Sequence, residues 1–192
     1  MRKFIVLVAV LFGICTAGLV YAMPLTWSTN GHEYQIIENT GITWLDAKDH
    51  SMTLGDGWHL ATITTLEEQN FLNDLIPIPS SRTQFWIGGY QTPNSNPLEN
   101  WNWVTGEAWT WANWDNNPTP PQPDDWQGDQ IYLALDSNSG SWKWDDNTDT
   151  LQFTAGYIAE RSAPVPEPTT ILLLGTGLVG LAGFRRKKLQ NK

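Results

Sequence analysis

The chain is organised around the stretch from Gln122 to Asp146, which opens with Gln122-Pro123-Asp124-Asp125-Trp126 and closes with Trp144-Asp145-Asp146. An amide side chain and a carboxylate flank the proline, and a second acidic pair ends the stretch. Calcium takes about six to eight oxygen ligands, so a site needs several such groups brought together by a bent loop and a neighbouring strand. The stretch therefore predicts a Ca²⁺ site, with ligands from Gln122, Asp124, Asp145 and Asp146.

Both ends of the 192-residue chain have the composition of processing segments. Arg2-Lys3, the apolar run from Phe4 to Leu19 and the small residue Ala22 are typical of a secretory signal peptide, so residues 1–22 are expected to be removed. The only cysteine, Cys15, would leave with this segment. The mature chain would then contain no disulfide.

Residues 23–163 are expected to form one folded domain with a strongly acidic surface. They contain 19 acidic and 4 basic residues, a net charge of −15. Such a surface repels nucleic acid and favours divalent cations, which excludes nucleic acid as a partner. Most of the twelve tryptophans are expected in the core, because their large rings supply buried area to a domain without disulfides.

The spacing of apolar residues predicts two helices followed by strands. A helix should start after Thr43 and end at Gly55, and a second should run from the capping pair Thr64 and Glu67 to Pro77. Short apolar runs ended by turn residues predict strands within 31–37, 85–89, 101–104, 131–135, 142–144 and 157–159. Four prolines make residues 113–125 an extended loop. The pattern predicts an α+β domain with an antiparallel sheet.

A series of short motifs supports a family resemblance over residues 31–161. The motifs are Gly57-Trp58-His59-Leu60-Ala61-Thr62-Ile63, Glu67-Glu68-Gln69-Asn70-Phe71, Trp86-Ile87-Gly88, Trp103-Val104-Thr105-Gly106-Glu107, Trp144-Asp145-Asp146 and Gly156-Tyr157-Ile158-Ala159-Glu160. In this order they resemble the markers of the C-type lectin-like domain. The resemblance implies a double-looped α+β fold whose long loop holds calcium and whose opening and closing strands pair.

Within this family, Gln122-Pro123-Asp124 resembles the sugar-site tripeptide of galactose-type members, and Asp125 and Trp126 also match that group. The resemblance implies that Ca²⁺ coordinates two adjacent hydroxyls of galactose or N-acetylgalactosamine. Gln122, Asp124 and Asp145 would contact the sugar, and Trp126 would cover its apolar face. It also implies a cis peptide bond before Pro123.

The chain departs from the family pattern in ways that bear on the site. Ser51, Tyr132 and Ala159 take three half-cystine positions, so the usual disulfides should be missing. Asp145 replaces the usual asparagine, and the glycine-rich loop after the tryptophan is absent. The acidic ligand usually found before the next strand is either Asp129 or Gln130, and both stay open as further metal ligands.

The C-terminal segment, residues 164–192, resembles the PEP-CTERM sorting signal of Gram-negative bacteria. It contains Pro166-Glu167-Pro168, an apolar stretch over 170–184 and the basic run 185–188. The resemblance implies transient attachment to the membrane, removal of the tail by an exosortase, and export to the cell surface or an exopolysaccharide matrix. A plain C-terminal membrane anchor is the alternative.

Three functional classes follow from these features. An enzyme that cleaves glycosides could take its acid and base from Asp124, Asp125, Asp145 and Asp146. Carboxylates beside a metal stay ionised, however, so no proton donor is evident. No Ser-His-Asp set is visible either. We therefore expect an exported, calcium-dependent carbohydrate-binding domain and not an enzyme. A calcium-independent structural or protein-binding domain of the extracellular matrix is the alternative. His32, His50 and His59 are scattered, so no zinc site is expected.

Overall fold

The computed structural model describes residues 23–93, 95–117, 120–149 and 153–162. Two helices are present, α1 (Trp44–Met52) and α2 (Leu66–Leu75), with the short 3-10 helix η1 (Trp126–Gly128). The strands are β1 (Leu25–Thr26), β2 (Glu33–Glu38), β3 (His59–Leu60), β4 (Gln84–Gln91), β5 (Trp101–Trp103), β6 (Tyr132–Asp136), β7 (Lys143–Asn147) and β8 (Thr154–Arg161). The predicted α+β class is confirmed.

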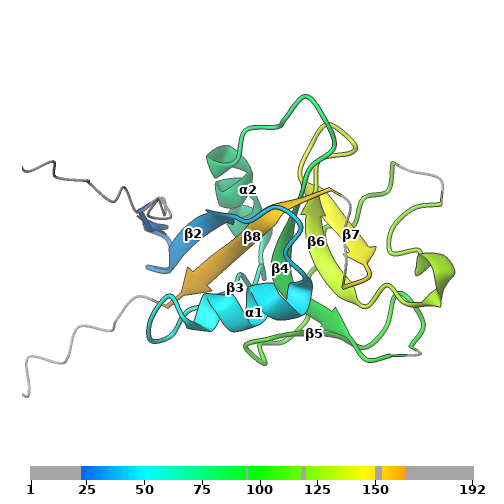
Figure 1. The fold of residues 1–192 in the computed structure, drawn as a ribbon, viewed down its shortest axis with the longest axis horizontal. Helices are drawn as coiled ribbons and strands as arrows, with labels where there is room; N and C mark the ends of the chain where they lie inside the picture. Colours follow the sequence, from blue (N-terminus) through cyan, green and yellow to red (C-terminus); the bar gives the residue numbers. More distant parts are fainter. Residues whose placement is uncertain (1–22, 94, 118–119, 150–152, 163–192) are drawn as a thin grey trace, which may run out of the picture.

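One sheet in the order β1-β2-β8-β4-β6-β7 forms the framework, with β3 paired to β8 and β5 to β4. The first long strand β2 lies antiparallel to the last strand β8, with Glu33 opposite Arg161, so the two ends of the domain lie side by side (Figure 1). The prediction of an antiparallel sheet is wrong at one place, because β4 and β8 run parallel. A parallel pair needs a long connection, and β5 to β7 together with the long loop supply it.

Helix starts follow the capping residues. Thr43 Oγ1 accepts a hydrogen bond from Asp46 N at 3.0 Å, which confirms the predicted cap of α1. The cap of α2 is Thr65 and not the predicted Thr64, because Thr65 Oγ1 accepts from Glu68 N at 3.2 Å. The neighbouring pair Thr65 and Glu68 has the same three-residue spacing as the predicted pair. Sequence spacing could not separate the two threonines.

The core lies on both faces of the sheet, with one helix on each. Side chains alternate along a strand, so Trp86, Ala134 and Tyr157 pack with the α1 residues Trp44 and Ala47. The residues between them face the other way and form a second cluster that includes Leu72 of α2. Seven of the twelve tryptophans are buried, as expected: Trp44, Trp58, Trp86, Trp101, Trp103, Trp142 and Trp144. Neither α1 nor α2 is long and apolar enough to cross a bilayer, and the segment 170–184 lies outside the described residues.

Strand β7 corrects the prediction for the acidic end of the organising stretch. The apolar pattern predicts that this strand ends at Trp144. In the structure β7 continues to Asn147, and the side chains of Asp145, Asp146 and Asn147 are buried. Polar groups tolerate burial when they have hydrogen-bond partners, and each of these side chains has them. Asp145 and Asp146 therefore lie buried under the long loop.

Candidate functional site

A hollow of about 400 Å³ lies where the long loop meets β7 and the start of β4. Five of its lining residues are predicted site residues: Gln122, Asp124, Trp126, Gln130 and Asp145. The others are Arg82, Gln84, Asn147, Thr148 and Phe153. The structure therefore brings most of the predicted set together, although the residues come from segments far apart in the chain.

Hydrogen bonds within the loop hold it in a tight bend above the hollow. The Gln122–Pro123 peptide bond is cis, as the resemblance implies. Asp125 has φ 45°, and its Oδ1 accepts a hydrogen bond from Gln130 N at 3.1 Å. Gln130 Oε1 in turn accepts from Trp126 N. This bend leaves the Trp126 ring 65% exposed at the rim, so Trp126 is not a core residue.

Asp146 lies behind the hollow and anchors the loop. Its Oδ1 accepts a hydrogen bond from Asp124 N at 3.0 Å, and its Oδ2 accepts one from Asp125 N at 2.8 Å. Its side chain is fully buried and does not line the hollow. Burial raises the pKa of Asp146 to about 6, against the opposite effect of the two backbone N–H groups. The orientation of the tripeptide therefore depends on this carboxylate.

Asp145 faces a group of polar side chains that sequence reasoning missed. Its Oδ2 accepts hydrogen bonds from Arg82 Nη2 and Gln84 Nε2, each at 2.8 Å, and from Asn147 Nδ2 at 3.0 Å. Burial, with a smaller contribution from the neighbouring Asp136 carboxyl, raises the pKa of Asp145 above its usual range, although the Asn147 hydrogen bond and the Arg82 charge act in the opposite direction. The sequence contains one signal for this group: Arg82 is one of only four basic residues in residues 23–163, so a pairing with acidic residues could be expected.

The two open candidates for a further metal ligand, Asp129 and Gln130, lie in different places. Gln130 is buried and lines the hollow, whereas Asp129 is exposed and does not line it. Only Gln130 is thus grouped with Gln122, Asp124 and Asp145.

The residues that line the hollow offer oxygen atoms of the kind that calcium prefers. Gln122 Oε1 is buried and has no hydrogen-bond partner among the described residues. A buried acceptor without a partner costs about 1 to 3 kcal/mol, and a hard cation that prefers oxygen would satisfy it. Asp124 and Asp145 add carboxylate oxygens from the loop and from β7. Gln122, Asp124, Gln130 and Asp145 could therefore hold the ion, with Arg82 as an opposing positive charge in the same hollow.

A second polar cluster joins β2, α2 and β8. His32, Glu68 and Glu160 place their ligand atoms within 4.8 Å of one another, close enough to hold a metal ion. Glu160 Oε2 accepts from Thr62 N at 2.7 Å, and Glu160 Oε1 lies 2.5 Å from His32 Nδ1. Burial raises the pKa of Glu160 to about 7, while the Thr62 N–H lowers it. His32 is thus paired with a carboxylate, and its partners could not be found from sequence spacing.

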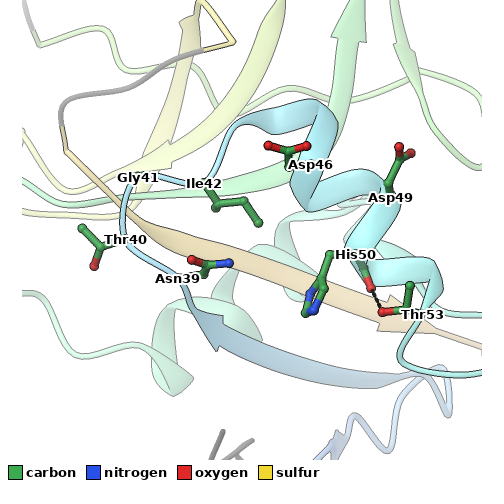
Figure 2. Close-up of a pocket in the computed structure, with 8 residues that line it drawn as sticks. All are labelled: Asn39, Thr40, Gly41, Ile42, Asp46, Asp49, His50 and Thr53. Atoms are coloured by element: carbon green, nitrogen blue, oxygen red, sulfur yellow. Dashed lines mark hydrogen bonds between the residues drawn. The ribbon is translucent and has the colours of Figure 1, made fainter.

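Another hollow, of about 530 Å³, lies between residues 39–42 and α1 (Figure 2). Asp46, Asp49 and His50 are among its lining residues. Figure 2 shows that the two carboxylates point away from the His50 ring. This hollow contains no predicted site residue, so it is not the candidate site.

Comparisons with known proteins identify two parts of the chain. A family model described as Lectin C-type domain matches residues 40–127. A model described as PEP-CTERM protein-sorting motif matches residues 164–187, which lie outside the described residues. This motif implies an exported, exosortase-sorted protein of the cell surface.

Three similar curated proteins come from a barnacle, a snake and human. Lectin BRA-3 of Megabalanus rosa is 29% identical over 74% of this chain and 82% of that protein. Snaclec A13 of Macrovipera lebetinus is 30% identical over 57% of this chain and 82% of that protein. Human C-type lectin domain family 10 member A is 29% identical, but the match spans only 29% of its length.

Solved structures share the fold at low sequence identity. The C-type lectin domain of murine dendritic cell inhibitory receptor 2 has a TM-score of 0.54 at 16% identity, over 68% of this chain and 91% of that chain. Human lithostathine has a TM-score of 0.55 at 20% identity, over 72% of this chain and 88% of that chain. The chain therefore belongs to the C-type lectin domain family, a family of non-enzymatic lectin domains, and carries a PEP-CTERM sorting motif.

Proposed function

We propose that residues 23–163 bind glycans in a calcium-dependent manner at the hollow between the Gln122–Trp126 loop and β7. The observation that carries this proposal is the convergence of oxygen donors there, with the buried Gln122 Oε1 lacking a partner among the described residues. The ligand class is a terminal galactose or N-acetylgalactosamine, as the tripeptide resemblance implies.

Each site residue has a role in this proposal. The calcium ligands are Gln122, Asp124, Gln130 and Asp145. A bound calcium ion would have open coordination positions for two adjacent sugar hydroxyls. Asp146 contributes through the loop that it anchors, and its carboxylate is a further candidate ligand. Of the pair Asp129 and Gln130, Asp129 is the less favoured ligand, because Gln130 lines the hollow and Asp129 does not.

Trp126 provides the aromatic surface of the proposed site. Its indole ring is exposed at the rim, although a tryptophan normally gains stability from burial. An aromatic face beside the ion suits galactose, because that sugar has one apolar face opposite its polar hydroxyls. The exposure of Trp126 therefore supports a role in ligand contact over a role in packing.

Relatives and export give the proposal its context. BRA-3 is named a lectin, and one structure of this fold is of a complex with an N-glycan. A domain exported by the sorting motif would meet glycans of the cell surface or matrix. Binding of one sugar at an open site is expected to be weak, so display of many copies would be needed for strong attachment.

A second candidate function is calcium-independent binding, and one observation favours it. Arg82 lines the hollow, and its guanidinium already pairs with Asp145, one of the proposed calcium ligands. The fold is also that of a lectin described as Ca²⁺-independent, SPL-2 of Saxidomus purpuratus, at 17% identity and a TM-score of 0.53. Removal of calcium separates the two candidates.

Galactose titration with calcium and with a chelator tests the proposal. We expect roughly millimolar affinity in calcium, near −4 kcal/mol, and no binding in the chelator. Trp126→Ala should weaken galactose binding by at least about tenfold, about 1.4 kcal/mol, without changing calcium affinity. Leu98→Ala, at another exposed apolar side chain, should change neither. Galactose binding that survives chelation would contradict the proposal, as would a Trp126→Ala variant that no longer binds calcium.

A further inference from the structure

One of the residues that line the hollow is positively charged, namely Arg82. Arg82 Nη2 donates to Asp145 Oδ2 at 2.8 Å, and Arg82 Nε donates to Asp136 Oδ2 at 2.7 Å. We propose that Arg82 is a built-in counter-charge, which stabilises the site in the absence of calcium and lowers the affinity of the site for calcium. This inference rests on the proposed function, because it assigns Arg82 a role at the same calcium site.

Arg82 stabilises the calcium-free site because two buried carboxylates share it. The Asp136 and Asp145 side chains are almost fully buried, and Gln84 Nε2 donates to both Oδ2 atoms at 2.8 Å. Like charges this close repel strongly where water is excluded. Loss of one partner from a buried ionic group leaves an uncompensated charge. Arg82 therefore keeps Asp145 in place under the loop when no metal ion is present.

The same positive charge opposes the binding of a second cation. Arg82 lines the hollow together with Gln122 and Asp124, and it uses Asp145, one of the proposed ligands. A calcium ion at these donors would be repelled by the guanidinium and would share Asp145 with it. Arg82 also contacts Phe153, another lining residue, because its guanidinium lies 5.1 Å from the centre of the Phe153 ring. It cannot simply swing away without losing these contacts.

The position of Arg82 distinguishes it from the other basic residues of the domain. Lys48 pairs with Asp49 on α1, Lys143 bonds Asn113, and Arg161 pairs with Glu33, and none of these lines the hollow. Asp145 stands where the family resemblance predicts asparagine. Its negative charge, which an asparagine would lack, is thus paired with the positive charge of Arg82, 63 residues earlier in the chain.

Replacement of Arg82 should change calcium affinity and calcium-free stability in opposite directions. Arg82→Gln is expected to bind calcium at least about tenfold more tightly than the wild-type chain at low ionic strength. Its melting temperature in chelator should fall below that of the wild type. Added calcium should then raise the melting temperature more than in the wild type, because the variant binds calcium more tightly. Calcium titration by calorimetry and thermal unfolding of the same samples measure both effects.

Arg161→Gln is the matched control, because it removes the same charge from another half-buried ion pair away from the hollow. It should leave calcium affinity unchanged within about twofold. Arg82→Gln combined with Asp136→Asn leaves the net formal charge of this group unchanged, because one positive and one negative charge are removed together. It should also bind calcium more tightly, because Asp145 no longer pairs with a guanidinium, even if the single variant folds poorly.

The outcomes separate this inference from the proposed function. If the wild type binds calcium and both Arg82 variants bind it equally well or more weakly, the proposed role of Arg82 is overturned. The proposed calcium site is then unaffected. Calcium binding by the variants but not by the wild type supports the role of Arg82 and favours the calcium-independent function for the native chain. Absence of calcium binding in all of them overturns both proposals.

Discussion

Replacing Asp146 by alanine is expected to abolish both calcium binding and glycan binding, although this side chain does not line the hollow. Its carboxylate accepts one hydrogen bond each from Asp124 N and Asp125 N. A hydrogen bond to a charged group contributes about 1.5 to 3 kcal/mol, so loss of both releases the loop that carries Gln122 and Asp124. Calcium affinity should fall at least about 100-fold, and titration with calcium measures the loss.

Two variants make this test specific to the anchoring carboxylate. Asp146→Asn keeps one carbonyl oxygen for one backbone N–H but presents an NH₂ group to the other, so its calcium affinity should lie between those of the wild type and Asp146→Ala. Asp129→Ala removes an exposed aspartate nearby and should leave calcium affinity unchanged. Calcium binding by Asp146→Ala within a few-fold of the wild type would contradict the anchoring role. A large loss in Asp129→Ala would restore Asp129 as a ligand.

The local parts of the fold could be predicted because their signals lie within a few residues of each other. Thr43 caps α1 through the backbone of Asp46, and the described residues 120–125 of the proline-rich segment lie in the long loop. The apolar runs became strands for the same reason. The choice between Thr64 and Thr65 failed, because both offer a hydroxyl at the right distance from a glutamate.

The polar interior of the site could not be predicted, because its partners are distant in the chain. Residues 145–147 have the composition of a surface loop, and only their hydrogen bonds to Arg82, Gln84 and the long loop make burial in β7 tolerable. The parallel pairing of β4 with β8 is likewise a property of the whole topology. The tripeptide indicated where the site lies, but its charge balance depends on Arg82.

The site is also coupled to the hydrophobic core through β7, because Trp144 directly precedes Asp145 and Asp146. Trp144 is fully buried, and its Nε1 donates to Gln69 Oε1 on α2 at 2.8 Å. It makes edge contacts with the four rings of Trp103, Trp109, Trp111 and Trp114 at 5.2 to 5.7 Å between ring centres. These rings come from β5 and the loop that follows it. Trp144 therefore joins the long loop, α2 and β7.

Trp144→Ala is accordingly expected to destabilise the domain by about 3 to 5 kcal/mol, the usual cost of truncating a buried tryptophan. The loss leaves a cavity under the loop and removes the hydrogen-bond donor to Oε1 of the buried Gln69. Urea unfolding measures the change, and Trp126→Ala is the matched control, because that ring is exposed and its loss should cost less than about 0.5 kcal/mol. Similar unfolding free energies for the two variants would contradict the stabilising role of Trp144.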